Sequence, residues 1–504
     1  MAETLETMRA RFGALTAKIR SYQEALGVLH WDLRTGAPPR AVSTRSETIG
    51  MLSAECLRLS VSEEMGELLA FFEQPDVWPL LHEVERASIR ECRREYDRNR
   101  RIPPETYRAF VALTAEAESV WEEAKKASDF KIFLPYLRKI VNYLREFAEI
   151  WGYREHPYDA LLQPYEPGMT VARLDRIFGA LRPKLAELVR AVAASGKNPD
   201  PSALKGHFPV ERQKELNRRL LCDLGYDFEA GRLDESAHPF AIGLGPGDVR
   251  ITTRYSEDDL TVGLFGTIHE CGHALYEQHL PAGLYGTPLW DGASMGVHES
   301  QSRLWENMIG RSRAFGDRYL PVFREYFPEP FGRISTETFY RAVNAARPSL
   351  IRTEADELTY NLHIIIRYEI EKSLFDGRIS ADDLPTVWND LYADLLGVRP
   401  GNDAEGVLQD VHWAGGSFGY FPSYALGNVY AAQLLEAMRK TVDVDGCVAD
   451  GRFEAIRGWL HERVWRYGKQ FDPEDLIEKA TGSPANPDAL LAYLQHKYGE
   501  LYGL

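Results

Sequence analysis

Apolar residues recur at three- and four-residue spacing along most of the chain, which is the pattern of amphipathic helices. Gly and Pro interrupt the pattern and mark the helix ends. The pattern predicts helices at 3–28, 43–73, 76–98, 104–127, 129–152, 171–195, 210–224, 257–280, 297–314, 335–346, 356–375, 383–396, 424–440, 451–465 and 486–499. We therefore expect a mainly α-helical protein.

One stretch departs from the helical pattern. Short β-branched runs at 238–243 and 248–255 flank Gly245-Pro246-Gly247, which is typical of a β-hairpin. The hairpin is expected to be an isolated strand pair placed just before the helix at 257–280. An exposed strand edge there can pair with an extended peptide, although the runs also fit a small stabilising ribbon.

No Ser/Gly-rich linker, low-complexity tract or fixed-period repeat divides the 504 residues. The segment 196–209 is the best position for a hinge. We expect one domain over 1–504, built as a helical lobe at 1–209 and a catalytic portion at about 210–504.

Charge and composition narrow the choice of partners. The chain has 59 Lys and Arg against 75 Asp and Glu, a formal net charge of −16, which argues against nucleic acid or an anionic membrane. No apolar run approaches the roughly 18–20 residues that span a bilayer, and the start of the chain lacks the features of a secretory signal. The five cysteines are scattered, so we expect free thiols and a cytoplasmic protein.

The run His269-Glu270-Cys271-Gly272-His273 carries the strongest chemical signal in the sequence. His269 and His273 are about one helical turn apart, so both imidazoles project toward a common point, as two nitrogen ligands of Zn²⁺ require. Glu270 can reach a metal-bound water without binding the ion, which suits a general base. Gly272 leaves the helix surface bare beside the metal, and Cys271 is expected to be a packed thiol.

A catalytic metal site needs a third protein ligand and one open position. Glu299, 26 residues after His273, is the best choice because a Gly- and Pro-containing loop returns the chain into a new helix. Glu306, Asp291 and His298 are its rivals. We expect Glu306, on the same helix face as Glu299, to hydrogen-bond a ligand imidazole, with a solvated glutamate as the alternative.

Six sequence blocks in order connect the chain to a known family. They are HPF at 238–240, DVRIT at 248–252, HECGH at 269–273, HESQ at 298–301, IRTEAD at 351–356 and GVLQDVHW at 406–413. With these blocks the sequence resembles the carboxypeptidase Taq family of metallopeptidases. The resemblance implies a mostly helical, two-lobed, saddle-shaped homodimer with a deep groove. It also implies one Zn²⁺, or alternatively Co²⁺, per subunit, bound by His269, His273 and Glu299, with Glu270 as the base.

A carboxypeptidase must hold the free α-carboxylate of its peptide substrate, and the planar fork of arginine suits that task. Arg352, in the IRTEAD block, is our first choice and Arg250, on the hairpin, is the second. Each is alternatively a structural or surface ion pair. His238 either binds substrate or merely starts the hairpin.

The segment 410–424 is rich in glycine and aromatic residues. A glycine-rich loop can approach a ligand closely, and an imidazole or phenol can donate to a developing oxyanion. A similar arrangement in helical oligopeptidases with the same metal motif makes His412 and Tyr424 the expected donors and Tyr420 a substrate contact. A structural aromatic loop is the alternative.

These patterns predict a metallocarboxypeptidase of broad specificity that releases single C-terminal amino acids. An endo-oligopeptidase or dipeptidyl carboxypeptidase on the same scaffold is the alternative, and the masses of the products distinguish them. The hypothesis from another class of protein is a non-catalytic scaffold with a closed, four-ligand structural metal site.

Overall fold

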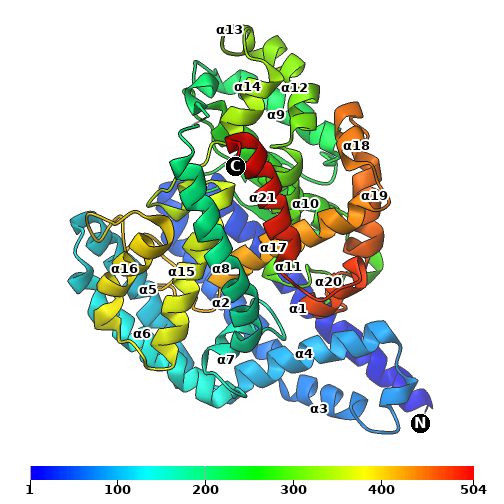
Figure 1. The fold of residues 1–504 in the computed structure, drawn as a ribbon. Helices are drawn as coiled ribbons and strands as arrows, with labels where there is room; N and C mark the ends of the chain where they lie inside the picture. Colours follow the sequence, from blue (N-terminus) through cyan, green and yellow to red (C-terminus); the bar gives the residue numbers. More distant parts are fainter. Residues whose placement is uncertain (1, 198) are drawn as a thin grey trace.

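The structure, a computed structural model, describes residues 2–197 and 199–504 and is mainly α-helical (Figure 1). The α-helices are α1 (Ala2–Thr35), α2 (Val42–Ser60), α3 (Glu63–Phe72), α4 (Glu83–Arg101), α5 (Pro104–Ala127), α6 (Phe130–Trp151), α7 (Tyr158–Leu162), α8 (Val171–Ala194), α9 (Val210–Leu224), α10 (Leu260–Gln278), α11 (Met295–Arg303), α12 (Arg313–Tyr326), α13 (Pro328–Phe331), α14 (Thr336–Val343), α15 (Glu357–Phe375), α16 (Leu384–Leu396), α17 (Phe421–Arg439), α18 (Val444–Asp450), α19 (Phe453–Arg463), α20 (Pro473–Thr481) and α21 (Asp488–Tyr502). Short 3₁₀ helices lie at Pro39–Ala41, Trp78–Leu80, Pro201–Leu204, Ala282–Leu284, Arg352–Glu354, Ala381–Asp383 and Trp465–Tyr467, and a π-helix at Leu304–Ile309 continues α11. The predicted mainly helical class is confirmed.

Some helices differ from the predicted ones where a capping residue or a proline interrupts the hydrophobic pattern. The helix predicted at 43–73 is divided into α2 and α3, because the Ser62 side chain accepts a hydrogen bond from the Met65 amide at 3.2 Å and starts a new helix. The helix α12 was not predicted, and it contains Pro321 in its interior. Asn198, within the predicted hinge at 196–209, lies outside the described residues.

The strands form a small mixed sheet next to α10. Strands β2 (Ala241–Gly245) and β3 (Asp248–Thr253) pair antiparallel with Ile242 opposite Arg250, which confirms the predicted hairpin. The expectation of an isolated pair was wrong, because β1 (Leu233–Glu235) adds in parallel to β3 and gives the order β1-β3-β2. A three-residue strand with two acidic residues has no pattern that marks it as a strand in sequence.

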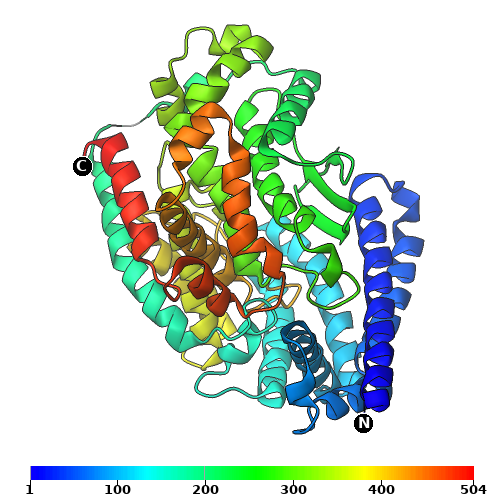
Figure 2. The same cartoon turned by 90° about the vertical axis from the view of Figure 1, so that its right-hand side faces the viewer.

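The sheet lies between the N-terminal helix α1 and the rest of the helical body (Figure 2). Alternation along β3 buries Val249 and Ile251 completely and directs Arg250 to the opposite face. Helix α10 packs on β3 and β2, whereas α1 packs on β2, where Arg20 donates to the Leu244 carbonyl at 3.2 Å. The sheet therefore supports α10 on one side and has α1 along the edge strand β2.

Two hydrophobic clusters stabilise the fold. A small one joins α1, α3 and α4 and contains Leu15, Leu68 and Phe72. The large one takes buried residues from Ala87 through Tyr502, on both sides of position 209. The single domain over 1–504, and its division into lobes at 209, stay predictions.

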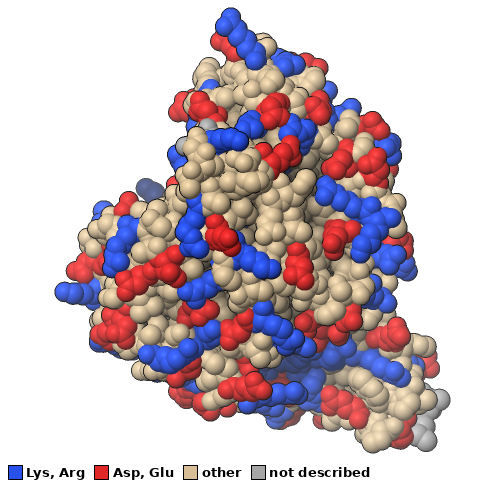
Figure 3. All heavy atoms as spheres, in the orientation of Figure 1, with Lys and Arg blue, Asp and Glu red and all other residues tan. Residues whose placement is uncertain are grey.

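The surface shows charges of both signs. Acidic and basic side chains intermingle over the face shown in Figure 3.

All five cysteines are free thiols. Across the described residues, the structure contains no helix that combines the length and apolar character needed to cross a membrane.

Candidate metal centre and active site

Helix α10 holds the predicted motif in the interior of the protein. The Asp259 side chain accepts a hydrogen bond from the Thr261 amide and caps the start of this helix. Its apolar positions, among them Leu264 and Ile268, belong to the main core. These contacts fix the helix along its length, so the face that carries the imidazoles has one orientation.

The structure brings His269, His273 and Glu299 together, as the sequence predicts. One ligand atom from each lies within 4.8 Å of the others. The Oε2 atom of Glu299, on α11, is 3.6 Å from Nε2 of His269 and 3.4 Å from Nε2 of His273. Two imidazole nitrogens and one carboxylate oxygen are the donor set of a catalytic Zn²⁺ site.

The outer nitrogens of both imidazoles have partners of their own. The Nδ1 atom of His269 is 2.9 Å from Oε2 of Glu306, which is the contact expected from the sequence. The Nδ1 atom of His273 is 2.6 Å from Nδ1 of His298, whose Nε2 is 2.8 Å from Oε1 of Glu277. These contacts direct each Nε2 toward Glu299, so the residues fit a divalent metal ion. His298, a rival ligand in sequence, lies behind His273.

Sequence reasoning missed the arginine that holds the carboxylate. Arg303 Nε donates to Oε1 of Glu299 at 2.7 Å, and the Ser302 hydroxyl donates to Oε2 at 3.0 Å. Although burial raises it, the charge of Arg303 and the nearby imidazoles hold the pKa of Glu299 well below its usual range. The four-residue spacing of Glu299 and Arg303 on one helix was a signal that could have identified this pair.

Two glycines allow the three helices of the site to approach one another. A Cβ atom on Gly272 of α10 would lie 2.6 Å from the Cα atom of Ser302 on α11. A Cβ atom on Gly427 of α17 would lie 2.6 Å from Cγ of Glu299. The helix α11 is thus held between α10 and α17 at a separation that only glycine permits.

Glu270 is buried beside the three converging donors, with 6% of its surface exposed. Burial raises the pKa of Glu270 to about 7, while the adjacent His269 opposes the rise. A cavity of about 780 Å³ is lined by Arg303, Glu306 and Tyr360, which lie next to the converging donors, whereas Glu270 and the three donors are not among its lining residues.

The glycine- and aromatic-rich segment lies against the same region. The Nε2 atom of His412 is 3.3 Å from the Tyr424 hydroxyl, and the Tyr420 ring packs edge-on against Tyr424 with centroids 5.1 Å apart. The Nδ1 atom of His412 is buried without a hydrogen-bond partner in the described part of the chain. Burial lowers the pKa of His412 to about 4, against the opposing charge of Asp410 and with the help of the nearby arginines, so this imidazole is neutral at pH 7.

Arg352 is connected to the metal-ligand group through Tyr360. Its NH1 group donates to the Tyr360 hydroxyl at 3.2 Å, and the Arg303 guanidinium lies 4.5 Å from the centroid of the Tyr360 ring. The Nε and NH2 groups of Arg352 donate to Asp410 at 2.9 and 2.7 Å. Three contacts, through Tyr360 and Arg303, therefore connect Arg352 to Glu299.

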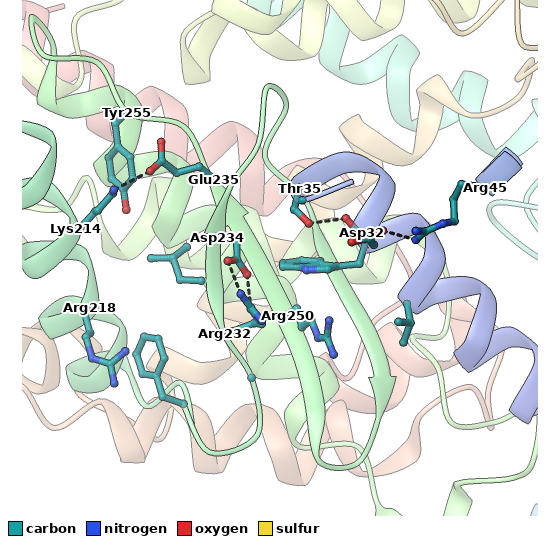
Figure 4. A pocket seen from close by; sticks show the side chains of 16 residues that line it. Asp32, Thr35, Arg45, Lys214, Arg218, Arg232, Asp234, Glu235, Arg250 and Tyr255 are labelled. Carbon is teal, nitrogen blue, oxygen red and sulfur yellow. Dashed lines mark hydrogen bonds and ion pairs between the residues drawn. The ribbon is translucent and has the colours of Figure 1, made fainter. Parts of the chain in front are cut away.

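The structure does not bring Arg250 to this group. Arg250 lines a separate cavity of about 1080 Å³ between α1, α9 and β1 (Figure 4). Its guanidinium forms an ion pair with Asp248 at 2.6 Å. The guanidinium also lies 5.6 Å from the centroid of the Trp31 ring. His238 is exposed before β2, and the structure records no contact between it and the metal-ligand residues.

A helical protein that directs two imidazoles and a carboxylate to one point, with a buried glutamate beside them, has the site of a metal-dependent hydrolase. The model of the carboxypeptidase Taq (M32) metallopeptidase family matches residues 11–498, and the chain belongs to that family. It is a metallocarboxypeptidase, an enzyme that acts on peptides.

Individual relatives agree with this assignment over nearly the whole chain. Carboxypeptidase 1 of Bacillus subtilis (strain 168) is 49% identical over 500 residues, which cover 99% of each chain. Thermostable carboxypeptidase 1 of Thermus thermophilus is 45% identical over 96% of this chain and 97% of the relative. The crystal structure of the M32 carboxypeptidase from Deinococcus radiodurans R1 is 39% identical, with a TM-score of 0.95 over 99% of this chain and 100% of that chain.

Proposed function

We propose that the enzyme releases single amino acids from the free C-terminus of peptides, with broad specificity. His269, His273 and Glu299 hold one Zn²⁺ per subunit, with Co²⁺ as the alternative ion. Such an ion activates water and polarises the scissile carbonyl group. The resemblance to the family supports a homodimer as the working form.

The protein groups carry out the remaining steps. Glu270 accepts the proton of the attacking water and passes it to the leaving amine nitrogen. His412 and Tyr424 donate hydrogen bonds to the carbonyl oxygen as negative charge develops on it. The Nδ1 atom of the neutral His412 imidazole, which has no hydrogen-bond partner among the described residues, supports this role, since a buried polar atom without a partner is costly unless substrate satisfies it. Tyr420, edge-on to Tyr424, contacts the substrate.

One observation carries the assignment as an exopeptidase. Arg352 and Arg367 both form ion pairs with the single carboxylate of Asp410, at 2.7 and 2.6 Å, so these three groups have a net charge of 2 − 1 = +1. The exposed fractions of the two arginines are only 7% and 0%. Glu371, on the same helix as Arg367, places a second carboxylate near Arg367. Among the described residues, the carboxylate that pairs with Arg352 is shared with Arg367. A buried guanidinium that shares its anion is suited to bind another one, and we propose that the α-carboxylate of the substrate is that anion.

The products distinguish this proposal from its alternatives. Timed digests of a mixed peptide library, with Zn²⁺ or Co²⁺ restored after chelation, are expected to release single amino acids detected by mass spectrometry. Peptides with an amidated C-terminus are expected to be cleaved much more slowly. Dipeptides would instead indicate a dipeptidyl carboxypeptidase, internal fragments an endo-oligopeptidase, and equal cleavage of amidated peptides would contradict the proposal.

Substitution of Arg352 tests which arginine binds the substrate carboxylate. We expect Arg352→Lys to raise KM for peptides with a free C-terminus about tenfold or more, because an ammonium cannot reproduce the planar, bidentate contact. Arg250→Lys is the matched control, and it should leave KM unchanged because Arg250 lines the other cavity. An increase of KM in the Arg250 variant alone would reverse the assignment. Thermal unfolding checks that the Arg352 variant is folded.

Substitution of Glu306 tests how the first imidazole is oriented. We expect Glu306→Ala to weaken metal binding about ten- to hundredfold, since His269 loses the partner that orients its ring. Competition with a metal-binding dye measures the affinity. The control Glu325→Ala removes an exposed glutamate that pairs with Arg219, and this variant should bind metal normally. Equal affinity in both variants would show that Glu306 does not support the site.

A further inference from the structure

The buried carboxylate of Glu371 holds two points of the glycine- and aromatic-rich segment 410–424, called the aromatic loop below. Glu371, on α15, is completely buried and accepts hydrogen bonds from three groups. Its Oε1 atom accepts from Nε1 of Trp413 at 2.7 Å, and its Oε2 atom accepts from the Gly419 amide at 3.0 Å and from the Tyr158 hydroxyl. Three donors from α7 and from two points of the loop therefore meet at one side chain.

We propose that Glu371 is a positioning residue for peptide hydrolysis, which sets the places of His412 and Tyr420 through Trp413 and Gly419. This inference rests on the function proposed above, in which the loop contributes groups that contact the substrate. Trp413 directly follows His412 and Gly419 directly precedes Tyr420, so both fixed points are adjacent to the residues of interest.

The loop between the two fixed points is itself rigid. The rings of Trp413 and Phe418 are stacked at 5.8 Å with an interplanar angle of 2°. Gly419 has φ of +89°, and a Cβ atom there would lie 2.2 Å from the Leu161 carbonyl oxygen of α7. Glycine is required at this point, and the loop has no space to move toward α7.

Hydrogen bonds hold the His412 ring only weakly. Among the described residues, the ring has one recorded hydrogen-bond contact, with Tyr424 at 3.3 Å, and its Nδ1 atom has no partner. The His412 carbonyl also accepts from the Ser417 amide at 2.8 Å, which ties the backbone to the same loop. The ring also packs against Phe421, with centroids 4.5 Å apart, so its position depends on this contact and on where Glu371 places the backbone. A buried carboxylate with several donors is suited to this, because hydrogen bonds are strong in a low-dielectric interior.

Glu371→Gln tests the proposal with almost no change of volume. The amide oxygen can still accept from Gly419 and Tyr158, but the amide nitrogen then faces the indole N–H of Trp413, and two donors oppose each other. We expect kcat to fall about tenfold, with KM and metal content unchanged. Hydrogen exchange of amides in 411–420 should become faster. The matched control is Glu369→Gln on the same helix, whose carboxylate pairs with Lys372 at 3.1 Å and should show neither change.

A second variant approaches the same contact from the loop. Trp413→Phe removes the indole N–H, so combining it with Glu371→Gln relieves the opposed donors. The two losses of kcat should therefore be less than multiplicative. Fully multiplicative effects, or normal kcat and normal loop exchange in Glu371→Gln, would overturn the proposal, as would faster exchange with unchanged kcat.

His412→Ala and Tyr424→Phe separate this result from a failure of the proposed function. If both keep full kcat, the loop has no part in the reaction, and the proposed function and the role of Glu371 fall together. If both lose kcat while Glu371→Gln keeps it, the proposed function stands and the role of Glu371 alone is wrong.

Discussion

Glu270→Gln is expected to lower kcat by about a hundred- to ten-thousandfold, the usual contribution of a general base. Glutamine has nearly the shape of glutamate but cannot accept the proton of water at neutral pH. Glu270 is buried next to His269 and is not one of the three converging donors. The metal content should therefore stay unchanged, and steady-state kinetics with metal analysis of the same sample measure both quantities.

The control for this prediction is Glu325→Gln, the same chemical change at an exposed ion pair. It should retain full turnover and full metal content. A Glu270 variant that binds metal normally and turns over at the normal rate would show that another group accepts the proton. Loss of metal in the Glu270 variant would mean that this carboxylate helps to bind the ion.

Gly272→Ala is expected to destabilise the protein and to weaken metal binding more than tenfold. Helix propensity alone favours alanine by about 1 kcal/mol. The new Cβ atom, however, would lie 2.6 Å from Cα of Ser302 and 2.7 Å from the carbonyl oxygen of Gln301, and backbone atoms cannot turn away as a side chain can. Overpacking of this kind costs about 1–3 kcal/mol or more, so the clash outweighs the gain in propensity. Separation of α10 from α11 then moves the imidazoles away from Glu299.

Gly458→Ala is the matched control for the Gly272 variant. Gly458 lies inside α19, and a Cβ atom there would meet nothing within 4 Å. Its midpoint of thermal unfolding should stay equal or rise, whereas that of Gly272→Ala should fall. Equal behaviour of the two variants would show that the contact between α10 and α11 does not depend on glycine. Gly427→Ala should also destabilise the protein, because a Cβ atom there would lie 2.6 and 2.7 Å from Cγ and Cβ of Glu299, which cannot move without shifting this carboxylate.

The metal-ligand geometry was accessible from sequence because it depends mainly on local periodicity. His269 and His273 share a helix face by spacing alone, and Glu299 follows on the next helix after a loop. The contact of Glu306 with His269 was predicted by the same reasoning, from its seven-residue spacing to Glu299. Spacing within and between adjacent helices was sufficient for this part of the site.

Other features depend on residues far apart in the chain, and spacing gave no signal for them. The role of Gly272 appeared in sequence as a bare surface beside the metal, whereas the structure uses it for the approach of α11. Glu371 joins α7 to the aromatic loop. It lies 213 residues after Tyr158 and 42 residues before Trp413 in the sequence. Such contacts arise only after the helices have packed.

The sequence by itself determined the helical class, the hairpin and the three side chains that converge at the site, because periodicity and short spacing fix which side chains share a face. Tertiary structure alone decided that Arg352 lies near the metal-ligand group and Arg250 in another cavity. Both arginines lie in blocks that match the family, so composition and motif could not separate them. The physical reason is the alternation of β3, which buries Val249 and Ile251 against the core and directs Arg250 away from it.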